Sequence, residues 1–344
     1  HRLPLAVAAR KEGFSVQVAT MGGKCAEKIE QQGFTHHTLF LSRSGSNPFK
    51  ELITFFSMWR LFVQLRPDLV HLVTIKPVLY GGIAARLANV PGVISAISGL
   101  GYLFVTKKVN FRVRIIRNVV LFLYRLAMNH SNQIVIFQNK TDMNALLRAA
   151  GLRKHKIRLV RGSGVDLIDY SVMPEPDGLP VIVMASRLLK DKGVYEFVEA
   201  ARIVQSRGFE ARFQLVGVPD LGNPGSVTAE TVSSWNKENV VDCLGFRSDI
   251  SSLFSQAHII TLPSYYREGL PKVLVEAAAC GRAVITTDTA GCRDAIESDL
   301  TGLLVPARDS EALAQAMQRL IGDAPMRQRM GREGRIFAER EFGI

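Results

Sequence analysis

Short apolar runs alternate with amphipathic helical patterns along the whole chain, and no other feature of the sequence restricts the fold as much. The first half contains the apolar runs FSVQVAT, DLVHLV, GVISAI and NQIVIF, with helical patterns near residues 48–65 and 78–88 between them. The second half contains PVIVMAS, ARFQLVG, HIITLPS and AVITT, with helical patterns near residues 193–207 and 271–280. Strands that alternate with helices in this way predict a parallel sheet covered by helices. The predicted fold class is therefore α/β.

The length and one loop-like segment predict two domains. The chain has 344 residues, of which 47% are hydrophobic and 22% charged, and a chain of this size can bury two cores. The segment VDLIDYSVMPEPDGLP is rich in Pro, Asp and Gly and has no periodicity. We therefore predict an N-terminal Rossmann-like domain over residues 1–163, a linker over 164–179 and a C-terminal Rossmann-like domain over 180–344. In such doubly wound pairs the ligand site is expected in the cleft, at the carboxyl ends of the strands.

Both ends of the chain have the pattern of an incomplete element. The first residues read as the second half of a helix followed by a strand, so the first strand of the N-terminal domain is expected to be missing. The last residues, GREGRIFAEREFGI, continue a helical pattern without a cap, which indicates a truncated end. Whether a membrane anchor precedes residue 1 stays open, and no segment resembles a targeting sequence. The longest apolar stretch is interrupted by Arg125 and is shorter than the ~20 residues that span a bilayer.

Positive charge is concentrated in one region of a chain whose net charge is +12. Residues 101–161 contain a single acid, Asp142, among many lysines and arginines. In KKVNFRVRIIRNVVLFLYRLAMNH the cations are interleaved with Phe, Ile, Val and Leu, a pattern typical of a helix at an anionic lipid surface. We therefore expect an anionic membrane surface to bind through residues 107–128, with a merely solvated helix face as the alternative. No nucleic-acid partner is expected, because no helix-turn-helix, RNP-type or zinc-finger motif accompanies the charge.

The cysteines do not form a metal-binding or disulfide pattern. Cys25, Cys243, Cys280 and Cys292 include no CxxC pair and no histidine at ligand spacing. Four reduced thiols in a cytosolic protein are the expectation, without a structural zinc site.

The turn SYYREGLPKVLVEAAACG, which follows the strand HIITLP, has a pattern suited to ligand binding. Gly269, Leu270 and Pro271 are expected to open a helix whose free N–H groups and dipole form an anion seat. Glu268 stands at the entrance, and Glu276 follows eight positions later, about two helical turns along the same side. Taken alone, the two glutamates are better explained as an ordinary N-terminal acid and an exposed helix residue.

A second turn, ASRLLKDKGV, changes this interpretation. It places Arg187 and Lys192 just before a helix, at the carboxyl edge of a central strand, where they would meet an anionic ligand in the cleft. Two cations and two carboxylates around one helix N-terminus match a pyrophosphate that links a hydroxyl-rich sugar to a ribose. A nucleotide sugar is the ligand expected from this combination.

These stretches, with FQLVG, VDCLGFRSDI and TGLLVPARDSEALAQAM, resemble the C-terminal domain of family 4 glycosyltransferases, which have the GT-B fold of two Rossmann-like domains facing each other across a cleft. The likeness covers residues 185–318. It implies that Arg187 and Lys192 hold the donor diphosphate, that Glu268 contacts the transferred sugar, and that Glu276 binds the ribose hydroxyls.

Further donor contacts follow from the same resemblance. The backbone at Gly269 and Leu270 would belong to the donor site, and the backbone near Phe246 and Arg247 would lie along the edge of the nucleobase. UDP is the commoner donor nucleotide among the similar proteins, and GDP stays open. The transferred sugar is a hexose or an N-acetylhexosamine whose identity the sequence does not reveal.

The N-terminal half, in HLVTIKPVLYGGIAARLANVPGVISAISGLGYLF, resembles bacterial transferases that build polysaccharide or glycan on undecaprenyl diphosphate. This implies a polyprenyl-linked glycan acceptor and a location at the cytoplasmic face of the membrane. Many family members have a His-Gly pair after the last of these strands, where this chain has Ser98 and Gly99. The departure puts a catalytic histidine in doubt, and His71, on an earlier strand, is better explained as a core histidine.

The resemblance predicts a retaining glycosyltransferase that uses no cofactor. Arg187, Lys192 and the helix beginning near Gly269 would stabilise the leaving diphosphate in place of a metal ion, so metal independence is expected. Two alternatives stay open: a non-hydrolysing sugar-nucleotide epimerase, and an inactive nucleotide-sugar-binding protein at the membrane.

Overall fold

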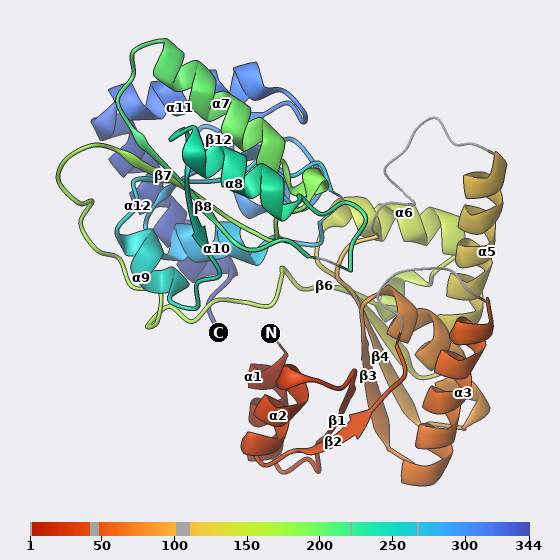
Figure 1. Ribbon diagram of the computed structural model, residues 1–344. Helices are drawn as coiled ribbons and strands as arrows, with labels where there is room; N and C mark the ends of the chain where they lie inside the picture. The colour runs from red at the N-terminus through yellow and green to blue at the C-terminus, as the bar shows by residue number, and fades with distance from the viewer. Residues whose placement is uncertain (1, 42–47, 101–110, 221, 267) are drawn as a thin grey trace. The chain divides into compact units, whose positions relative to one another are not determined.

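The computed structural model describes residues 2–41, 48–100, 111–220, 222–266 and 268–344 (Figure 1). They form two compact units, each with its own sheets. The first unit comprises residues 1–97, 111–136 and 145–158, and the second comprises residues 98–110, 137–144 and 159–344. Sheets covered by helices are present in both units, so the predicted α/β class is confirmed.

The first unit contains a four-stranded sheet with the order β3-β4-β5-β6 and a separate two-stranded parallel sheet, β1-β2. The strands are β1 Gln17–Thr20, β2 Thr35–Thr38, β3 Leu69–Val73, β4 Gly92–Ile97, β5 Gln133–Phe137 and β6 Ile157–Leu159. The helices are α1 Leu3–Lys11, α2 Lys24–Gln31, α3 Pro48–Leu65, η1 Pro77–Gly81, α4 Gly82–Leu87, α5 Phe111–Ala127, η3 Lys154–Lys156 and α6 Lys140–Ala150, whose residues up to 144 belong to the second unit.

The helices predicted in the first half are present, with one change. The helix predicted near residues 48–65 is α3. The one predicted near residues 78–88 is divided into a π-helical turn, η1, and the short helix α4. Residues 107–110 of the basic segment lie outside the described residues, and α5 begins at Phe111.

The second unit contains a six-stranded sheet with the order β12-β11-β10-β7-β8-β9, and every neighbouring pair in it is parallel. Its strands are β7 Val181–Ala185, β8 Arg212–Val216, β9 Asp242–Gly245, β10 Ile259–Leu262, β11 Ala283–Thr287 and β12 Gly302–Val305. Its helices are η4 Lys190–Lys192, α7 Val194–Ser206, α8 Ala229–Lys237, α9 Ile250–Ser255, α10 Lys272–Ala279, η5 Arg293–Ala295, α11 Ser310–Gly322 and α12 Ala324–Glu341.

Burial on both faces explains why the strands of this sheet read as continuous apolar runs. Helix α7 packs against α11, and α10 packs against α12, so helices cover the sheet on its two sides (Figure 1). All residues of β10 and β11 are buried. A parallel sheet covered on both faces favours this pattern over strict alternation.

The segment predicted as a linker, residues 164–179, lies along the second unit and is held there by three arginines. The side chain of Arg282, which is 1% exposed, donates hydrogen bonds to the carbonyl oxygens of Met173 and Pro174 at 2.9 and 3.1 Å. Arg335 donates to the carbonyl oxygen of Tyr170 at 2.8 Å. Arg327 forms a two-pronged ion pair with Glu175 at 3.0 and 2.9 Å. These hydrogen bonds and the ion pair fix the segment to the second unit.

Two expectations about the chain ends and membrane spans meet the structure here. Helix α12 ends at Glu341, and the N–H of Val165 donates to the carbonyl oxygen of Phe342 at 2.8 Å. Among the described residues, no helix is long and apolar enough to cross a bilayer.

Candidate functional site

The order of strands in the second unit marks the place for a ligand. From β7 the chain proceeds through β8 and β9 on one side, and the later strands β10, β11 and β12 lie on the other side. Strands β7 and β10 are hydrogen-bonded neighbours, so the direction of winding reverses between them. In open parallel sheets, ligands bind at the carboxyl ends of the strands where this reversal occurs. The loops after β7 and β10 are the ones that carry Lys192 and Glu268.

Glycine allows these two loops to touch. Gly193 has a φ of +81°, and a Cβ atom built on it would lie 2.2 Å from the carbonyl oxygen of Pro263. Any side chain at this position would push the loop after β7 away from the loop after β10. The N–H groups of Tyr265 and Tyr266 both donate to the carbonyl oxygen of Asp191 at 3.0 Å. Backbone hydrogen bonds therefore join the loop after β7 directly to the loop after β10.

Lys192 and Glu268 meet directly across the two loops. The Nζ atom of Lys192 pairs with Oε1 of Glu268, and both side chains are largely buried, with 15% and 12% exposed. The hydroxyl of Ser264 donates to the same carboxylate oxygen at 2.9 Å. Lys192 also lies 5.5 Å from the ring centre of Tyr266. The structure thus brings together two residues that the sequence analysis had predicted from separate motifs.

Asp191, beside this pair, is a residue that the sequence analysis missed. Its Oδ1 atom is buried and has no hydrogen-bond partner among the described residues. Burial raises the pKa of its carboxyl, and the charge of Glu268 adds to this, while Lys192 opposes it. The available signal was the acid between two lysines in LKDKG, directly after a strand of the sheet.

Arg187 approaches the same group of charges from the end of β7. Its side chain is 63% exposed, and Nη1 donates to Oδ2 of Asp220 at 2.9 Å. Its charge lowers the pKa of Asp191 and that of Tyr266, although burial dominates both and leaves both raised. Arg187 is therefore close enough to act on the Lys192–Glu268 surroundings, while its guanidinium remains accessible to a ligand.

Glu276 is held by a different set of partners. It lies in α10 with 7% of its surface exposed. Its Oε1 atom accepts a hydrogen bond from the hydroxyl of Tyr170 at 2.7 Å and lies 2.9 Å from Nζ of Lys272. The expectation that Glu268 and Glu276 lie two turns apart on one helix side is wrong, because α10 begins only at Lys272 and Glu268 belongs to the preceding turn. Sequence reasoning also missed Tyr170, whose place in an irregular segment gave no signal.

The turn at Gly269 and Leu270 is tightly enclosed. A Cβ atom at Gly269 would lie 2.0 Å from Oε1 of Gln138 and 2.7 Å from the backbone carbonyl carbon of Ser98, which cannot move aside as a side chain can, so only glycine fits. That oxygen accepts the N–H of Leu270 at 3.2 Å, and the amide of Asn139 donates to the carbonyl oxygen of Gly269 at 2.9 Å. The N–H of Leu270 is therefore not free, contrary to the expected anion seat. Gln138 and Asn139 belong to the part of the second unit formed by residues 137–144.

The remaining predicted positions lie apart from these contacts. Phe246 follows β9 and is 76% exposed. Arg247 donates to Asp249 at 2.7 Å, and this hydrogen bond lowers the pKa of Asp249 to about 2. Among the described contacts, none links Phe246 or Arg247 to Lys192 or Glu268. A nucleobase role for their backbone rests on the family resemblance and stays a prediction.

His71 and Ser98 are the two positions at which the expected family pattern was in question. His71 lies half-buried in the middle of β3, and burial lowers the pKa of its imidazole, as expected for a core histidine. Ser98 belongs to the second unit, where its carbonyl carbon would lie 2.7 Å from a Cβ atom at Gly269. Its backbone thus borders the turn at Gly269.

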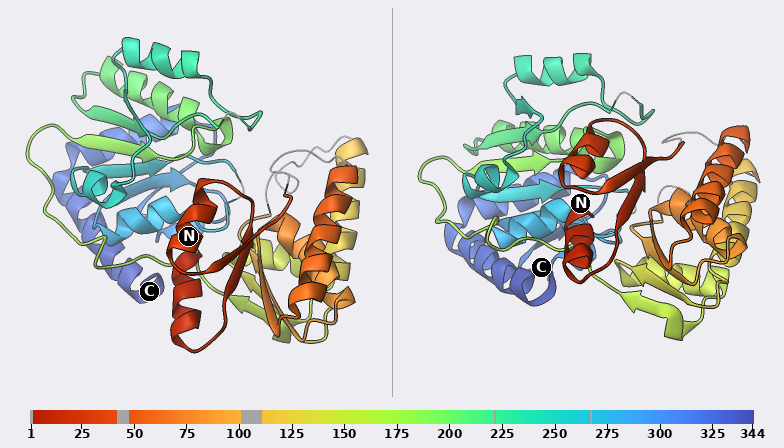
Figure 2. Two further views of the ribbon diagram at one scale, coloured as in Figure 1. Left: turned by 60° about the horizontal axis from the view of Figure 1, so that its bottom comes forward. Right: turned by 90° about the horizontal axis from the view of Figure 1, so that it is seen from below.

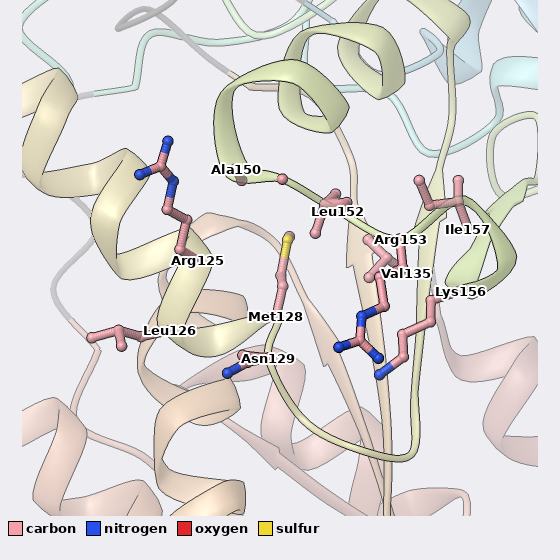
Figure 3. A pocket seen from close by; sticks show the side chains of 11 residues that line it. Arg125, Leu126, Met128, Asn129, Val135, Ala150, Leu152, Arg153, Lys156 and Ile157 are labelled. Carbon is pink, nitrogen blue, oxygen red and sulfur yellow. The ribbon is translucent and has the colours of Figure 1, made fainter.

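A separate pocket of about 420 Å³ lies in the first unit and contains none of the predicted site residues (Figure 3). Three cations line it, Arg125, Arg153 and Lys156. Arg125 donates to the carbonyl oxygen of Ala149 near the end of α6 at 2.8 Å, and Lys156 donates to the carbonyl oxygens of His130 and Ser131. These contacts satisfy carbonyl groups near helix ends, which explains two of the cations without a ligand.

Possible metal ligands and the cysteine thiols are the remaining residues about which the sequence made a prediction. Within the described part of the chain, no group of three or more His, Cys, Asp or Glu side chains is arranged to hold a metal ion. Cys243, Cys280 and Cys292 are free thiols, and the side chain of Cys25 lies outside the described residues. Burial raises the pKa of all three thiols.

Comparison with known proteins adds to this geometry. The family model "Glycosyl transferases group 1" matches residues 171–337, and the model "Glycosyl transferase 4-like" matches residues 1–139. The N,N'-diacetylbacillosaminyl-diphospho-undecaprenol alpha-1,3-N-acetylgalactosaminyltransferase of Campylobacter jejuni is 30% identical over 339 residues, which cover 95% of this chain and 87% of that relative. The chain belongs to glycosyltransferase family 4.

This glycosyltransferase is also similar to a second bacterial transferase and to a solved crystal structure. The UDP-Gal:alpha-D-GlcNAc-diphosphoundecaprenol alpha-1,3-galactosyltransferase of Escherichia coli is 24% identical over 80% of this chain and 71% of its own length. The Anabaena protein Alr3699/HepE, whose crystal structure contains UDP and glucose, has a TM-score of 0.75 at 20% identity, over 95% of this chain and 88% of its own. The glycosyltransferase therefore has the predicted GT-B fold.

Proposed function

We propose that this glycosyltransferase transfers a sugar, with retention of configuration, from a UDP-sugar to a glycan linked to a polyprenyl diphosphate. The observation that carries the proposal is the Lys192–Glu268 pair at the reversal point of the second sheet, with Arg187 at the same strand end. A cation beside a carboxylate at that edge suits a diphosphate joined to a sugar. The two relatives named for diphospho-undecaprenol substrates support the acceptor class, and the structure with bound UDP supports the donor nucleotide.

Charge development on the leaving group is the step that this site is built to stabilise. As the bond to the sugar breaks, negative charge grows on the diphosphate, and Arg187 and Lys192 are the cations that would meet it. Fixed charges aimed at such a position stabilise the transition state because they need no reorganisation during the reaction. No resident metal or cofactor is part of this proposal.

Glu268 has a different part in the same reaction. Its carboxylate is fixed by Lys192 and Ser264, so it can orient sugar hydroxyls while the sugar acquires oxocarbenium character. In a retaining reaction the acceptor hydroxyl attacks from the face that the diphosphate leaves. The departing phosphate oxygen can then take the acceptor proton, so no separate protein base is required.

Glu276 would bind the ribose of the donor. Its Oε1 atom is engaged by Tyr170 and Lys272, which fixes the plane of the carboxylate. A carboxylate held in this way can accept hydrogen bonds from neighbouring hydroxyls without first losing side-chain freedom.

The acceptor class implies a location at the cytoplasmic face of the membrane, held through α5. Phe111, Ile115, Val119 and Phe122 of this helix are 77%, 47%, 51% and 58% exposed. Arg114 lies among them and is also exposed, and the helix contains no acid. An apolar face bordered by cations suits an anionic lipid surface.

The experiment that tests the proposal supplies the protein with bacterial membranes and a panel of labelled UDP- and GDP-sugars. Label from one UDP-sugar is expected in a lipid-extractable product. Label that appears in an epimeric nucleotide sugar without any acceptor would replace transfer by epimerisation. UDP binding without product from any donor would indicate an inactive binding protein instead.

A further inference from the structure

Helix α3 has an apolar outer side that the proposed function does not use. Thr54, Met58 and Phe62 are buried and face the first unit. The opposite side exposes large apolar residues at helical spacing, with exposed fractions from 38% to 76%: Phe49, Leu52, Ile53, Phe56, Trp59 and Val63. A helix that is apolar on both sides belongs either to a core or to a membrane surface. The row runs from Phe49 to Val63 and so occupies most of α3, which has 18 residues and is about 27 Å long at 1.5 Å per residue; this exceeds the scattered apolar exposure usual on a soluble protein.

The charged residues of α3 indicate what covers this side. Lys50 and Arg60 are exposed. The only acid of the helix, Glu51, is turned inward and pairs with Lys76 at 2.5 Å. The outer side therefore presents cations and apolar groups without a carboxylate, which matches the headgroups and acyl chains of an anionic bilayer.

A second copy of the chain is a poorer match for the same side. Pairing α3 with α3 would bring Lys50 and Arg60 against the same cations of the partner, with no outward carboxylate on α3 to neutralise them. Like charges that are placed together and removed from water are destabilising. A bilayer containing anionic lipids has no such conflict.

The apolar outer side of α3 lies near α5, the helix already proposed to bind the membrane. Both α3 and α5 pack against η1, and α4 contacts both as well. Figures 1 and 2 show α3 and α5 on the same side of the β3–β6 sheet. Two apolar rows on one side of the unit can enter one flat interface together.

We propose that α3 lies in the lipid headgroup region of an anionic membrane, with Leu52, Ile53, Phe56 and Trp59 inserted among the acyl chains, so that α3 and α5 form a two-helix membrane-docking surface. This proposal rests on the membrane association included in the proposed function, and adds to it the helix, the inserted side chains and the orientation of the first unit.

The two tryptophans of the chain allow a direct test. Trp59 is 38% exposed on α3, whereas Trp235 is 4% exposed in the second unit. In the full chain with Trp235→Phe, Trp59 is the only tryptophan. Adding vesicles of phosphatidylcholine and phosphatidylglycerol should shift its emission to shorter wavelength, and vesicles with brominated acyl chains should quench it. Vesicles of phosphatidylcholine alone should do neither.

Matched substitutions measure the contribution of each helix in the otherwise unaltered chain. Leu52→Ser on α3 and Ile336→Ser on α12 change side chains that are each 53% exposed. Leu52→Ser should lower the vesicle partition coefficient by about tenfold, the effect of losing one buried large apolar side chain, whereas Ile336→Ser should leave it unchanged. Phe122→Ser tests α5 in the same way, and thermal unfolding confirms that each variant is folded.

The outcomes separate this inference from the proposed function. Co-sedimentation with vesicles that leaves Trp59 emission and quenching unchanged would overturn the role of α3 while leaving α5 bound. A blue shift that grows with protein concentration in the absence of vesicles would assign the surface to a second copy and overturn the proposal. Absence of binding to any vesicle would remove both membrane statements, and transfer to a detergent-solubilised acceptor would still test the reaction by itself.

Discussion

Lys192 and Glu268 neutralise each other at a depth where either charge alone would be costly. In the proposed reaction, the contact with Glu268 holds Lys192 in place for the donor diphosphate. We predict that Glu268→Gln lowers the turnover number for sugar transfer by two to three orders of magnitude, since contacts made in the transition state contribute about 3 to 4 kcal/mol. Steady-state transfer with a fixed donor measures this.

The control for this prediction is Glu311→Gln, which removes an exposed carboxylate paired with Arg207. Its turnover should match the wild type. Normal turnover of Glu268→Gln would remove this residue from the mechanism, and an equal loss in both variants would point to a general effect on folding.

Tyr170 holds the carboxylate of Glu276 in position through a hydrogen bond from its hydroxyl. Burial and its hydrogen bond to Glu276 raise the pKa of its hydroxyl, so the group stays protonated and donates. Without this donor, the carboxylate of Glu276 loses one of the contacts that fix it. We predict that Tyr170→Phe raises the KM for the donor roughly tenfold with little change in kcat, the value of one hydrogen bond to a charged group.

A readout specific to the ribose tests this further. The wild-type protein should prefer a UDP-sugar to its 2′-deoxy analogue, and Tyr170→Phe should weaken that preference. A variant that raises KM equally for both donors would indicate a structural role for Tyr170 rather than a role in ribose binding.

His258 is expected to make the stability of the second unit depend on pH. Its Nδ1 atom accepts the N–H of Val181 at 3.0 Å, so its Nε2–H donates to the carbonyl oxygen of Pro176 at 3.0 Å, and the ring must be neutral. Burial lowers the pKa of this imidazole below the ordinary value of 6.5. The folded state therefore holds fewer protons than the unfolded state, and stability is lost as the pH falls through 6.5 toward the lower folded pKa.

We predict that the unfolding temperature falls between about pH 7.5 and about pH 5, and falls less in His258→Gln. Differential scanning calorimetry of both proteins across this range measures the effect. Parallel pH profiles would show that His258 does not contribute to the change.

At the scale of secondary-structure elements, the irregular segment 164–179 depends on buried arginine. Arg282 donates to four carbonyl oxygens, those of Met173, Pro174, Phe254 and Ser255. We predict that Arg282→Leu lowers the free energy of unfolding of the second unit by more than about 3 kcal/mol, because several buried carbonyl groups lose their donor. Urea unfolding measures this, with Arg319→Leu, a change at a 56% exposed side chain, as the control. Equal stability of the two variants would contradict the prediction.

The same scale shows what the sequence could predict. Apolar periodicity predicted α3, α7 and α10 closely, because each must bury one side against a sheet or a neighbouring helix. The turn motifs predicted the meeting of Lys192 with Glu268, because parallel strands bring their carboxyl ends to one edge.

Contacts made by irregular segments could not be predicted in the same way. Tyr170 and Gln138 reach Glu276 and Leu270 from positions 106 and 132 residues away, and no local pattern encodes such pairings. Gly269 and Leu270 were expected to open α10, but Gln138 and Asn139 hold them in a turn before the helix begins at Lys272. The donor roles of the site residues and the domain boundaries stay predictions.

For the molecule as a whole, metal independence follows from the proposed use of Arg187 and Lys192. We predict that the transfer rate is unchanged in excess chelator, because protein cations supply the charge that a metal would otherwise supply. The measurement compares initial rates with EDTA, with added magnesium and with added manganese. Loss of activity in chelator, restored only by a divalent ion, would refute this.

The chain passes repeatedly between the two units before it completes either of them. Residues 137–144 belong to the second unit, although the segments before and after them belong to the first. A fragment that begins at residue 159 therefore lacks the side chains of Gln138 and Asn139, which in the intact chain pair with the N–H of Leu270 and the carbonyl oxygen of Gly269. We therefore expect that exchanging the second unit with that of a relative keeps these contacts only when residues 137–144 are transferred together with residues 159–344.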